Sequence, residues 1–580
     1  MSLSRRTILA LGAALPASAV LSRTAAAAGG AHPAAADGIT PAPIIPVSPG
    51  DTDGRIVAKA AHVVPTPHQL AWQRNELTVF THYGMNTFTD REWGSGCEDP
   101  AWFAPERVDV TQWMRVYRAA GAKLVMLTVK HHDGFVLYPT RYTRHSVTAS
   151  AWKSDVLGAY VRAARAAGLK VGVYLSPADG AELPHAWHAD WVTKIRAKQQ
   201  AGEVLSIEEQ ATLEDGDRAP GGHGRYGNGS ARTPRTLPTL VDGDDRARAV
   251  ARGDLPTFHV TVDDYDAYYL NQVYELFTQY GPIDELWLDG ANPWTDAGIT
   301  QEYDFATFYE VIGELSPKTV VFKAPCGVRW IGNEKGIARE SEWSVLPVTG
   351  DGVRMQVPGG ESGADLGSRE RLTGNPDVTS LRWFPGEADV SLRPGWYHHP
   401  DQRPKAAGEL VARYEQSVGR NAVLLLNVPP AKDGRVDPAD VAELTSFRRA
   451  LDRTYGTNLL SGARGRAAAA LADPRLTTGW SPAGGAVTGA LELTLPEAVT
   501  FDRVRLGEDI TRGQRVEGCA VDVWDGTGWR PAAAATTIGY SRILVLSSPV
   551  TAGRVRVRIT AARDTPRLAF LGLHRSAEPT

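Results

Sequence analysis

The sequence predicts an α/β protein in which a (β/α)8-type barrel is followed by an antiparallel β-sandwich. Between residues 62 and 455, continuous apolar runs alternate with amphipathic helical segments, which is typical of a parallel sheet with helices outside it. Polar side chains gather where the apolar runs end, as they do at the active face of a barrel. From residue 456 onward there is no lysine, and short alternating runs separated by Gly, Pro and Asp favour an antiparallel sandwich over 456–580.

The chain begins with the features of an export signal. Arg5 and Arg6 precede a mild apolar run and an Ala-rich segment, so residues 1–28 are predicted to be a twin-arginine signal peptide of a secreted bacterial protein. The apolar run is too short to span a membrane in the mature protein. Residues 29–61 are rich in Ala, Pro and Gly and are predicted to be a linker or a disordered arm.

Composition and charge exclude several classes of function. The 580 residues are 43% apolar and 22% charged with a net charge of -4, so no electrostatic argument favours a nucleic acid or an anionic membrane as partner. The three cysteines, Cys97, Cys326 and Cys519, form neither a disulfide framework nor a zinc-site spacing. Nothing in the sequence predicts an oligomeric state.

The first half of the predicted barrel has three strands. The run at 77–84 ends in a His-Tyr-Gly turn, and the run at 122–135 ends in His-His-Asp-Gly. A third strand is predicted at 170–177. Helical spacing of apolar residues, closed by Gly each time, predicts helices at 108–120 and 155–167.

The second half of the predicted barrel follows a long interruption. Residues 182–257 are polar and are predicted to be a surface excursion over the active face, in part disordered. Beyond this insertion the pattern resumes. It predicts helices at 265–280 and 305–315 and strands at 283–291, 319–325 and 421–430.

Asp289 is the first candidate for chemistry. It ends the apolar run at 283–291 and precedes Gly290, and an acid at the C-terminal tip of a barrel strand is where barrel enzymes keep their catalytic groups. The alternative is that Asp289 caps the following turn. Adjacent His131 and His132 on a strand would point to opposite faces, which disfavours a shared metal ion.

The remaining motifs favour carboxylate chemistry. No HxH, HExxH or GxSxG is present, so metal-protease and serine-hydrolase patterns are missing. What remains is a pair of carboxylates on a barrel face lined by Trp, His and Tyr. That combination suits a glycosidase.

The sequence resembles glycoside hydrolase family 29, the retaining α-L-fucosidases. The segments FTHYGMNTFTDREWG, KHHDGFVLYPT, DVLGAYVRAARAAGLKVGVYLSP and ELWLDGAN carry the resemblance, in that order, within residues 62–455. RWIGNEKGIA, PGWYHHP and SVGRNAVLLLNVPP resemble the branch that prefers branched α-1,3/1,4-fucosyl linkages.

The resemblance implies a role for each matching position. Asp289 matches the nucleophile and Glu334 the general acid/base of this branch. The positions that match the lining of the fucose pocket are His82, Glu92, Trp93, His131, His132, Tyr174 and Trp287. Trp93 and Trp287 are expected to meet the apolar face of fucose and the histidines its hydroxyl groups, unless one histidine is an ordinary core residue.

The acid/base assignment has rivals in the sequence. Glu340, Glu342, Glu361 and Glu387 are all expected near the same face. Glu334 must be protonated to release the leaving oxygen, so neighbouring cations such as Arg329 should point away from it.

The C-terminal region bears a weaker resemblance to discoidin-type (F5/8 type C-like) carbohydrate-binding sandwiches. It rests on DPRLTTGW, with Asp473, Thr477 and Trp480, ahead of the alternating runs. Such domains often hold a structural calcium ion. The alternative is a sandwich that docks on the barrel and has no ligand of its own.

Together these features predict a secreted, retaining exo-α-L-fucosidase that acts on fucosylated oligosaccharides or glycans and uses no metal or other cofactor in catalysis. Three alternatives stay open. One is the same chemistry with α-1,2 or α-1,6 preference or with transfucosylation. The others are an inactive glycan-binding barrel and a metal-dependent hydrolase.

Overall fold

The computed structural model describes residues 38–182, 185–205, 209–210, 212–213, 226, 229–292, 295, 300–350, 356–358, 360, 362–472 and 479–577, with side chains of the helix at 185–200 described from residue 192. The chain divides into two compact units, residues 1–41 and 42–580. The predicted signal peptide lies outside the described residues. All elements described below belong to the second unit.

The segment before residue 62 is folded where it is described, so the prediction of a linker up to residue 61 is wrong for that part. Strand β1 (Ile44–Pro46) pairs antiparallel with β11 (Val378–Trp383), and helix α2 (Asp53–Ala61) follows. The Thr52 side chain accepts a hydrogen bond from the Arg55 backbone N–H and caps α2. The Ala-rich composition had hidden this helix, whose buried face includes Ile56 and Val57.

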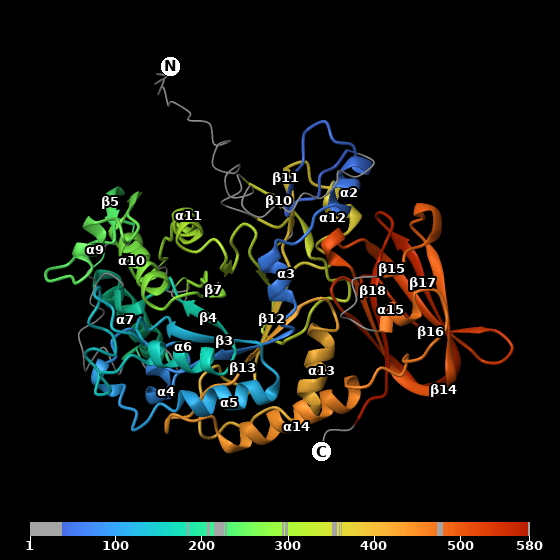
Figure 1. Cartoon of the computed structure of the whole chain (residues 1–580). Coiled ribbons are helices and arrows are strands. Elements are labelled where there is room, and N and C mark those ends of the chain that lie inside the picture. Colours follow the sequence, from blue (N-terminus) through green and yellow to red (C-terminus); the bar gives the residue numbers. More distant parts are fainter. Residues whose placement is uncertain are drawn as a thin grey trace. The chain divides into compact units, whose positions relative to one another are not determined.

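Eight parallel strands form the barrel sheet, shown in Figure 1. Their order is β8, β7, β4, β3, β2, β13, β12, β9. A single parallel bridge between Phe322 and Val328 joins the two edge strands, β8 and β9, so the sheet closes on itself. In chain order the strands are β2 (Leu77–Thr81), β3 (Leu124–Lys130), β4 (Lys170–Leu175), β7 (Glu285–Trp287), β8 (Val320–Val321), β9 (Arg329–Trp330), β12 (Gly386–Ser391) and β13 (Val423–Asn427).

Alternate residues of each strand point to two different cores. On β2, Val79 packs with the surrounding helices, whereas Phe80 lies in the barrel interior. On β3, Val125 and Leu127 face the helices, and Met126 faces inward. Both faces are buried, which explains why these strands read as continuous apolar runs.

Helices cover the outside of the sheet (Figure 1). Helix α5 begins where the Asp109 side chain accepts from the Gln112 backbone N–H and ends at Gly121, whose φ of 101° suits glycine. The described helices around the barrel are α3 (Pro67–Gln73), α4 (Met85–Thr89), η1 (Pro100–Trp102), α5 (Val110–Ala120), α6 (Val156–Ala166), η2 (Gly180–Glu182), α10 (Asp264–Gln279), α11 (Phe305–Leu315), α13 (Ala407–Ser417) and α14 (Pro438–Tyr455).

The barrel departs from eight regular β/α units. Only seven residues separate β8 from β9, and no helix lies between them. Between β9 and β12 the chain forms an antiparallel pair, β10 (Val345–Thr349) with β11, and the short helix α12 (Arg369–Thr373). The insertion is also partly regular, with α7 (His185–Gln200), α9 (Ala247–Ala251) and a hairpin of β5 (Thr233–Leu237) and β6 (Phe258–Val262).

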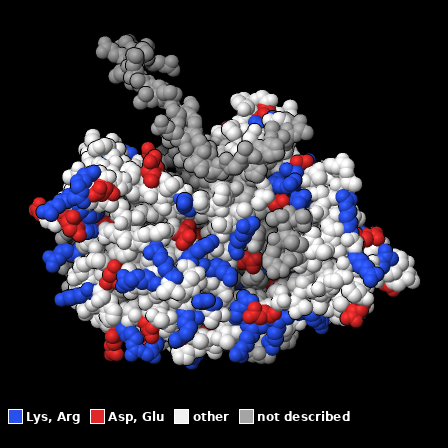
Figure 2. Space-filling view, in the orientation of Figure 1, with Lys and Arg blue, Asp and Glu red and all other residues white. Residues whose placement is uncertain are grey.

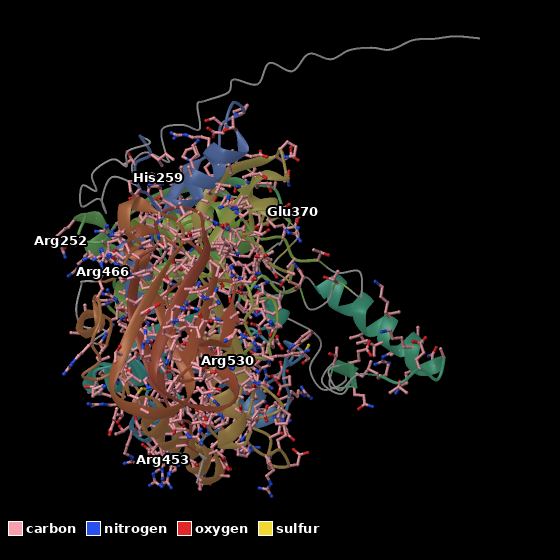
Figure 3. The ribbon with its side chains drawn as sticks, turned by 90° about the vertical axis from the view of Figure 1, so that its right-hand side faces the viewer. Arg252, His259, Glu370, Arg453, Arg466 and Arg530 are labelled. Carbon is pink, nitrogen blue, oxygen red and sulfur yellow. The ribbon has the colours of Figure 1, made fainter. Side chains whose placement is uncertain are left out.

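The C-terminal region has a separate hydrophobic core and five antiparallel strands in the order β16, β15, β17, β14, β18. Figure 3 looks onto these strands, with Arg530 near the viewer. Register shifts within β14 let the 20-residue strand bend over its own core. The elements are α15 (Ala468–Ala472), η4 (Ala483–Gly485), β14 (Gly489–Glu508), η5 (Ile510–Arg512), β15 (Val516–Trp524), β16 (Trp529–Ala535), β17 (Arg542–Ala562) and β18 (Leu568–His574).

The sandwich is hydrogen-bonded to the segment that follows β9. The Gln514 side chain accepts from the backbone N–H of Ser344 at 2.7 Å and donates to the backbone oxygen of Glu342 at 2.9 Å. The Thr537 hydroxyl accepts from the N–H of Glu342 at 3.1 Å. A second contact joins Arg505 to Glu76, just before β2.

Basic and acidic side chains are interspersed over the face shown in Figure 2, with no patch of one sign among the residues described.

Within the described part of the chain, no helix combines the length and the apolar character needed to cross a bilayer.

Candidate functional site

Asp289 lies just beyond the C-terminal end of β7, and its two oxygens face different partners. Its Oδ1 accepts from the backbone N–H of Ala291 at 3.0 Å, which fixes the turn. Its Oδ2 accepts from the Tyr174 hydroxyl at 3.0 Å and lies 3.8 Å from Nε2 of His132. The side chain keeps 31% of its surface exposed, so one carboxylate is held by the fold and still open to a ligand.

Glu334 lies on the loop after β9 and is exposed. Partial burial raises the pKa of its carboxyl group, a hydrogen bond from the Trp396 indole lowers it, and the charges of Asp289 and Glu92 raise it again. The net direction is upward. A carboxyl group with a raised pKa, close to a second carboxylate, is what a general acid requires.

Most rival glutamates are occupied elsewhere. Glu342 is buried in an ion pair with Arg329, so the guanidinium of Arg329 points away from Glu334 as predicted. Glu340 pairs with Arg420 and Arg542.

Of the two further rivals, the structure describes only Glu387. Glu387 was expected near the active face but lies on β12, inside the barrel, where it accepts from the Trp287 indole at 2.6 Å. Glu361 lies outside the described residues.

The histidines form one cluster, and the prediction that His131 and His132 point to opposite faces is wrong. Strand β3 ends at Lys130, so the alternation of a strand no longer applies, and the two ring centroids lie 4.3 Å apart. The ring centroids of His82 and His131 lie 5.5 Å apart. Nδ1 of His82 is 2.8 Å from Oδ1 of Asn427, which holds the His82 ring in place. His132 Nδ1 lies 2.8 Å from the Ser176 hydroxyl.

Burial keeps these rings neutral. It lowers the pKa of His82 to about 3 and the pKa of His131 well below its usual range. The pKa of His132 is also lowered by burial, although the charge of Asp289 opposes this. A neutral imidazole can donate one hydrogen bond and accept another, which suits sugar hydroxyl groups.

Aromatic rings line the same region. Trp287 stacks on Phe322 with centroids 3.8 Å apart and is 6% exposed, so most of its surface is barrel core. Tyr174 stacks on His131 at 5.6 Å. Trp93 is 43% exposed and lies perpendicular to His132 with ring centroids 5.9 Å apart, so part of its ring is open to a ligand.

Glu92 connects this cluster to the loop after β12. One carboxylate oxygen accepts from the backbone N–H of Trp396 at 2.8 Å, and the other lies 2.6 Å from Nε2 of His399. His399 had no expected role, and its only signal in the sequence was the PGWYHHP segment that carries part of the family resemblance.

The structure does not identify a metal centre. Among the residues it describes, no group of three or more His, Cys, Asp or Glu side chains could hold an ion. Asp473 and Thr477, part of the motif behind the calcium prediction, lie outside the described residues.

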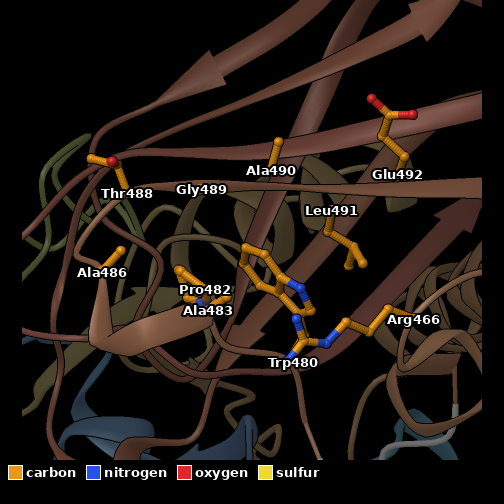
Figure 4. Close-up of a pocket in the computed structure, with 10 residues that line it drawn as sticks. All are labelled: Arg466, Trp480, Pro482, Ala483, Ala486, Thr488, Gly489, Ala490, Leu491 and Glu492. Carbon is orange, nitrogen blue, oxygen red and sulfur yellow. The ribbon is translucent and has the colours of Figure 1, made fainter.

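The sandwich has a pocket of its own, with about 240 Å³ of accessible volume (Figure 4). Trp480 and Leu491 are buried at its floor, and Arg466 and Glu492 are exposed at its rim. The complete lining is Arg466, Trp480, Pro482, Ala483, Ala486, Thr488, Gly489, Ala490, Leu491 and Glu492.

Comparison with known proteins gives a consistent result. Residues 72–337 match the family model described as alpha-L-fucosidase. Alpha-L-fucosidase 1 of Arabidopsis thaliana is 30% identical over 530 residues, which cover 88% of this chain and 87% of the plant protein.

Solved structures agree. A Bacteroides ovatus structure described as a candidate α-L-fucosidase has 34% identity and a TM-score of 0.71, covering 93% of this chain and 78% of the other. A Ruminococcus gnavus family 29 fucosidase in complex with fucose has 26% identity and a TM-score of 0.67. The match covers 92% of this chain and 97% of the other. The chain therefore belongs to the α-L-fucosidases of glycoside hydrolase family 29.

Proposed function

We propose that this α-L-fucosidase is a retaining exo-enzyme that releases terminal α-1,3- or α-1,4-linked L-fucose from branched glycans or oligosaccharides. The observation that carries the proposal is the pairing of Asp289 at the end of β7 with Glu334 on the loop after β9. The two are close enough for the charge of Asp289 to raise the pKa of Glu334. Opposed carboxyl groups of this kind serve as nucleophile and acid/base.

In the first step, the carboxylate of Asp289 attacks the anomeric carbon of fucose. Glu334 gives its proton to the glycosidic oxygen as the carbon–oxygen bond breaks, and the leaving sugar departs as an alcohol. Asp289 then holds fucose as an ester. The hydrogen bond from Tyr174 keeps the carboxylate oriented before the attack.

In the second step, Glu334 acts as a base. It takes a proton from water, the water oxygen attacks the anomeric carbon, and the ester bond to Asp289 breaks. Two inversions give net retention, for which the two carboxyl groups typically lie about 5–5.5 Å apart. If a sugar hydroxyl replaces water in this step, the product is a transferred fucose.

The fucose pocket is proposed to consist of His82, Glu92, Trp93, His131, His132, Tyr174 and Trp287. Its neutral histidines would bind hydroxyl groups, and the exposed face of Trp93 would cover the apolar side of the sugar. The fucose complex of the Ruminococcus gnavus relative supports a sugar of this kind.

Four further expectations belong to this proposal. The enzyme is exported through its twin-arginine segment, and catalysis needs no metal. The sandwich acts as a carbohydrate-binding module through the Trp480 pocket and can hold a structural calcium ion. The pocket volume and its aromatic floor support sugar binding there.

The test measures free L-fucose released from a Lewis-type trisaccharide and from an α-1,2-linked fucosyl-lactose, with a chelator present. Release from the branched sugar alone is expected. Release from the linear sugar alone would overturn the linkage preference, and activity lost with the chelator would favour a metal-dependent hydrolase. No release from either sugar would favour another linkage, such as α-1,6, or a glycan-binding role.

A further inference from the structure

The loop that follows α4 carries two carboxylates, Asp90 and Glu92, and the imidazole of His399 lies between them. Its Nδ1 is 2.6 Å from Oδ1 of Asp90, and its Nε2 is 2.6 Å from Oε1 of Glu92. Ionised carboxylates only accept hydrogen bonds, and a neutral imidazole has one N–H group. Both short contacts can therefore be satisfied together only by the doubly protonated imidazolium, which is 89% shielded from solvent since its side chain is 11% exposed.

The carboxylate of Glu92 also binds the backbone of the loop after β12. Its Oε2 accepts from the backbone N–H of Trp396 at 2.8 Å, and its Oε1 accepts from that of Tyr397 at 3.4 Å. The packing is close. A Cβ atom at Gly395 would lie 2.2 Å from Oε1 of Glu92 and 2.9 Å from Cδ2 of His399.

Trp396 links this arrangement to the acid/base. Its indole lies near enough to the carboxyl group of Glu334 to lower the pKa of that group as a donor, and its backbone oxygen accepts from the Asn427 side chain at 2.7 Å. Its ring lies 5.1 Å from that of His82. The tryptophan is thus held from one side by Glu92 and contacts Glu334 on the other.

We propose that Asp90, His399 and Glu92 form an ionic clamp that fixes Trp396 against Glu334, which makes His399 a positioning residue for the acid/base. This inference rests on the proposed role of Glu334. The clamp has two effects. It orients the indole donor, and its imidazolium offsets the negative charge of Glu92 beside the acid.

The other charged groups around His399 have partners of their own. The Arg393 side chain donates to the backbone oxygen of His399 at 3.5 Å, but it is paired with Asp440 and Asp437. His398 lies 3.2 Å from Asp437. The imidazole of His399 therefore faces Asp90 and Glu92.

The clamp is sensitive to pH. The hydrogen bond to Glu92 and the nearby charges raise the pKa of His399 to about 8. The clamp is intact below the usual pKa of histidine, about 6.5, and weakens as pH rises through 8. Its loss leaves the charge of Glu92 uncompensated and loosens the indole bond, and both changes raise the pKa of Glu334.

The test compares His399→Gln with His398→Gln, a matched loss of the neighbouring imidazole from the same loop. In His399→Gln, the alkaline limb of the pH profile of kcat/KM should shift to higher pH by about half a unit or more, because the pKa of Glu334 rises. Turnover of a Lewis-type trisaccharide should fall about tenfold or more, whereas that of 2,4-dinitrophenyl fucoside, which needs little acid assistance, should fall by less than about threefold. His398→Gln should keep the wild-type limb.

Two measurements separate the possible failures. Asp90→Asn changes a side chain that is 66% exposed, so it should fold even if His399→Gln does not, and it should show the same shift on a smaller scale. Nitrogen NMR of His399 should show both ring nitrogens protonated at pH 7, independently of activity.

Two results for His399→Gln would overturn the clamp: an alkaline limb of kcat/KM at the wild-type pH, or an equal fall in turnover on both substrates. A singly protonated ring at pH 7 would do so as well. If Glu334→Ala leaves the dependence on the leaving group unchanged, the acid/base assignment fails instead.

Discussion

Inside the barrel, the carboxyl group of Glu387 accepts a hydrogen bond from the indole N–H of Trp287 at 2.6 Å. Trp287 lies two residues before the candidate nucleophile, Asp289, on the same segment. Glu285, on β7, is buried beside the carboxyl group of Glu387, and its charge raises the pKa of that group. Burial and mutual repulsion raise the pKa of Glu387 well above its usual range, and burial raises that of Glu285 to about 7. The pair therefore carries at least one proton near neutral pH.

The pair predicts a pH-dependent stability. Between about pH 4.5 and 7 the folded state binds more protons than the unfolded chain, so the free energy of unfolding should fall as pH rises. Glu387→Gln keeps an acceptor for Trp287 and removes one acid. It should flatten this slope and raise stability at pH 8 by about 1–3 kcal/mol in denaturant unfolding.

The matched variant Glu387→Leu leaves the Trp287 N–H buried without its acceptor, which should cost about 1–3 kcal/mol relative to Glu387→Gln. A slope as steep in Glu387→Gln as in the wild type would show that the pair does not share a proton.

Asp289→Asn should abolish turnover, because an amide cannot form the ester intermediate. Tyr174→Phe removes only the hydrogen bond to Oδ2, so it should lower kcat about tenfold while Asp289 remains able to attack. Both are measured on an aryl fucoside with melting temperature as the folding control. Substantial turnover by Asp289→Asn would place the nucleophile elsewhere.

Glu334→Ala should slow substrates with poor leaving groups by about 10²–10⁴-fold and those with good leaving groups far less. Azide can attack the fucosyl ester without a general base, so it should restore part of the rate and give a fucosyl azide. Glu342→Gln is a poor control because its partner Arg329 is buried; Glu340→Gln, at an exposed side chain, is the better one. Small effects on all substrates would identify a different acid.

Arg505→Met should destabilise the whole chain, since it removes the partner of Glu76 between barrel and sandwich. Both side chains are mostly buried, so a loss of about 2–4 kcal/mol is expected, measured by thermal or denaturant unfolding. Arg530→Met is the control (Figure 3): its pair with Asp525 is at the surface and should contribute far less to stability. Equal effects would mean that the Arg505 contact adds no stability.

Much of the barrel could be predicted because its strands are buried on both faces. The helix at 305–315 was predicted with the bounds that the structure gives, and the strands at β2, β3, β4 and β13 were found in their apolar runs. Strand β9 was missed because its two residues, Arg329 and Trp330, do not belong to an apolar run such as the one that contains β8. Strand β12 was missed because its sequence, GEADVS, places two acids inside the barrel, which no rule of apolar periodicity can detect.

The site could be predicted in part for a similar reason. Asp289 follows a strong apolar run, so its place at a strand end was visible. Glu334 has no such local signal and depended on the family resemblance. The proximity of His131 to His132 and the contact of His399 with Glu92 arise from the ends of strands and from loops distant in sequence, where no periodic pattern operates.

Hydrogen bonds join Gln514 and Thr537 of the C-terminal region to the segment that carries Glu334, at Glu342 and Ser344. The C-terminal region is therefore more than an appended module that could be exchanged for another. A gene fragment ending near residue 455 would encode a barrel in which the loop that carries Glu334 lacks these contacts. In evolution the two halves should be inherited together, and a recombinant joining this barrel to a foreign sandwich would have to recreate those contacts first.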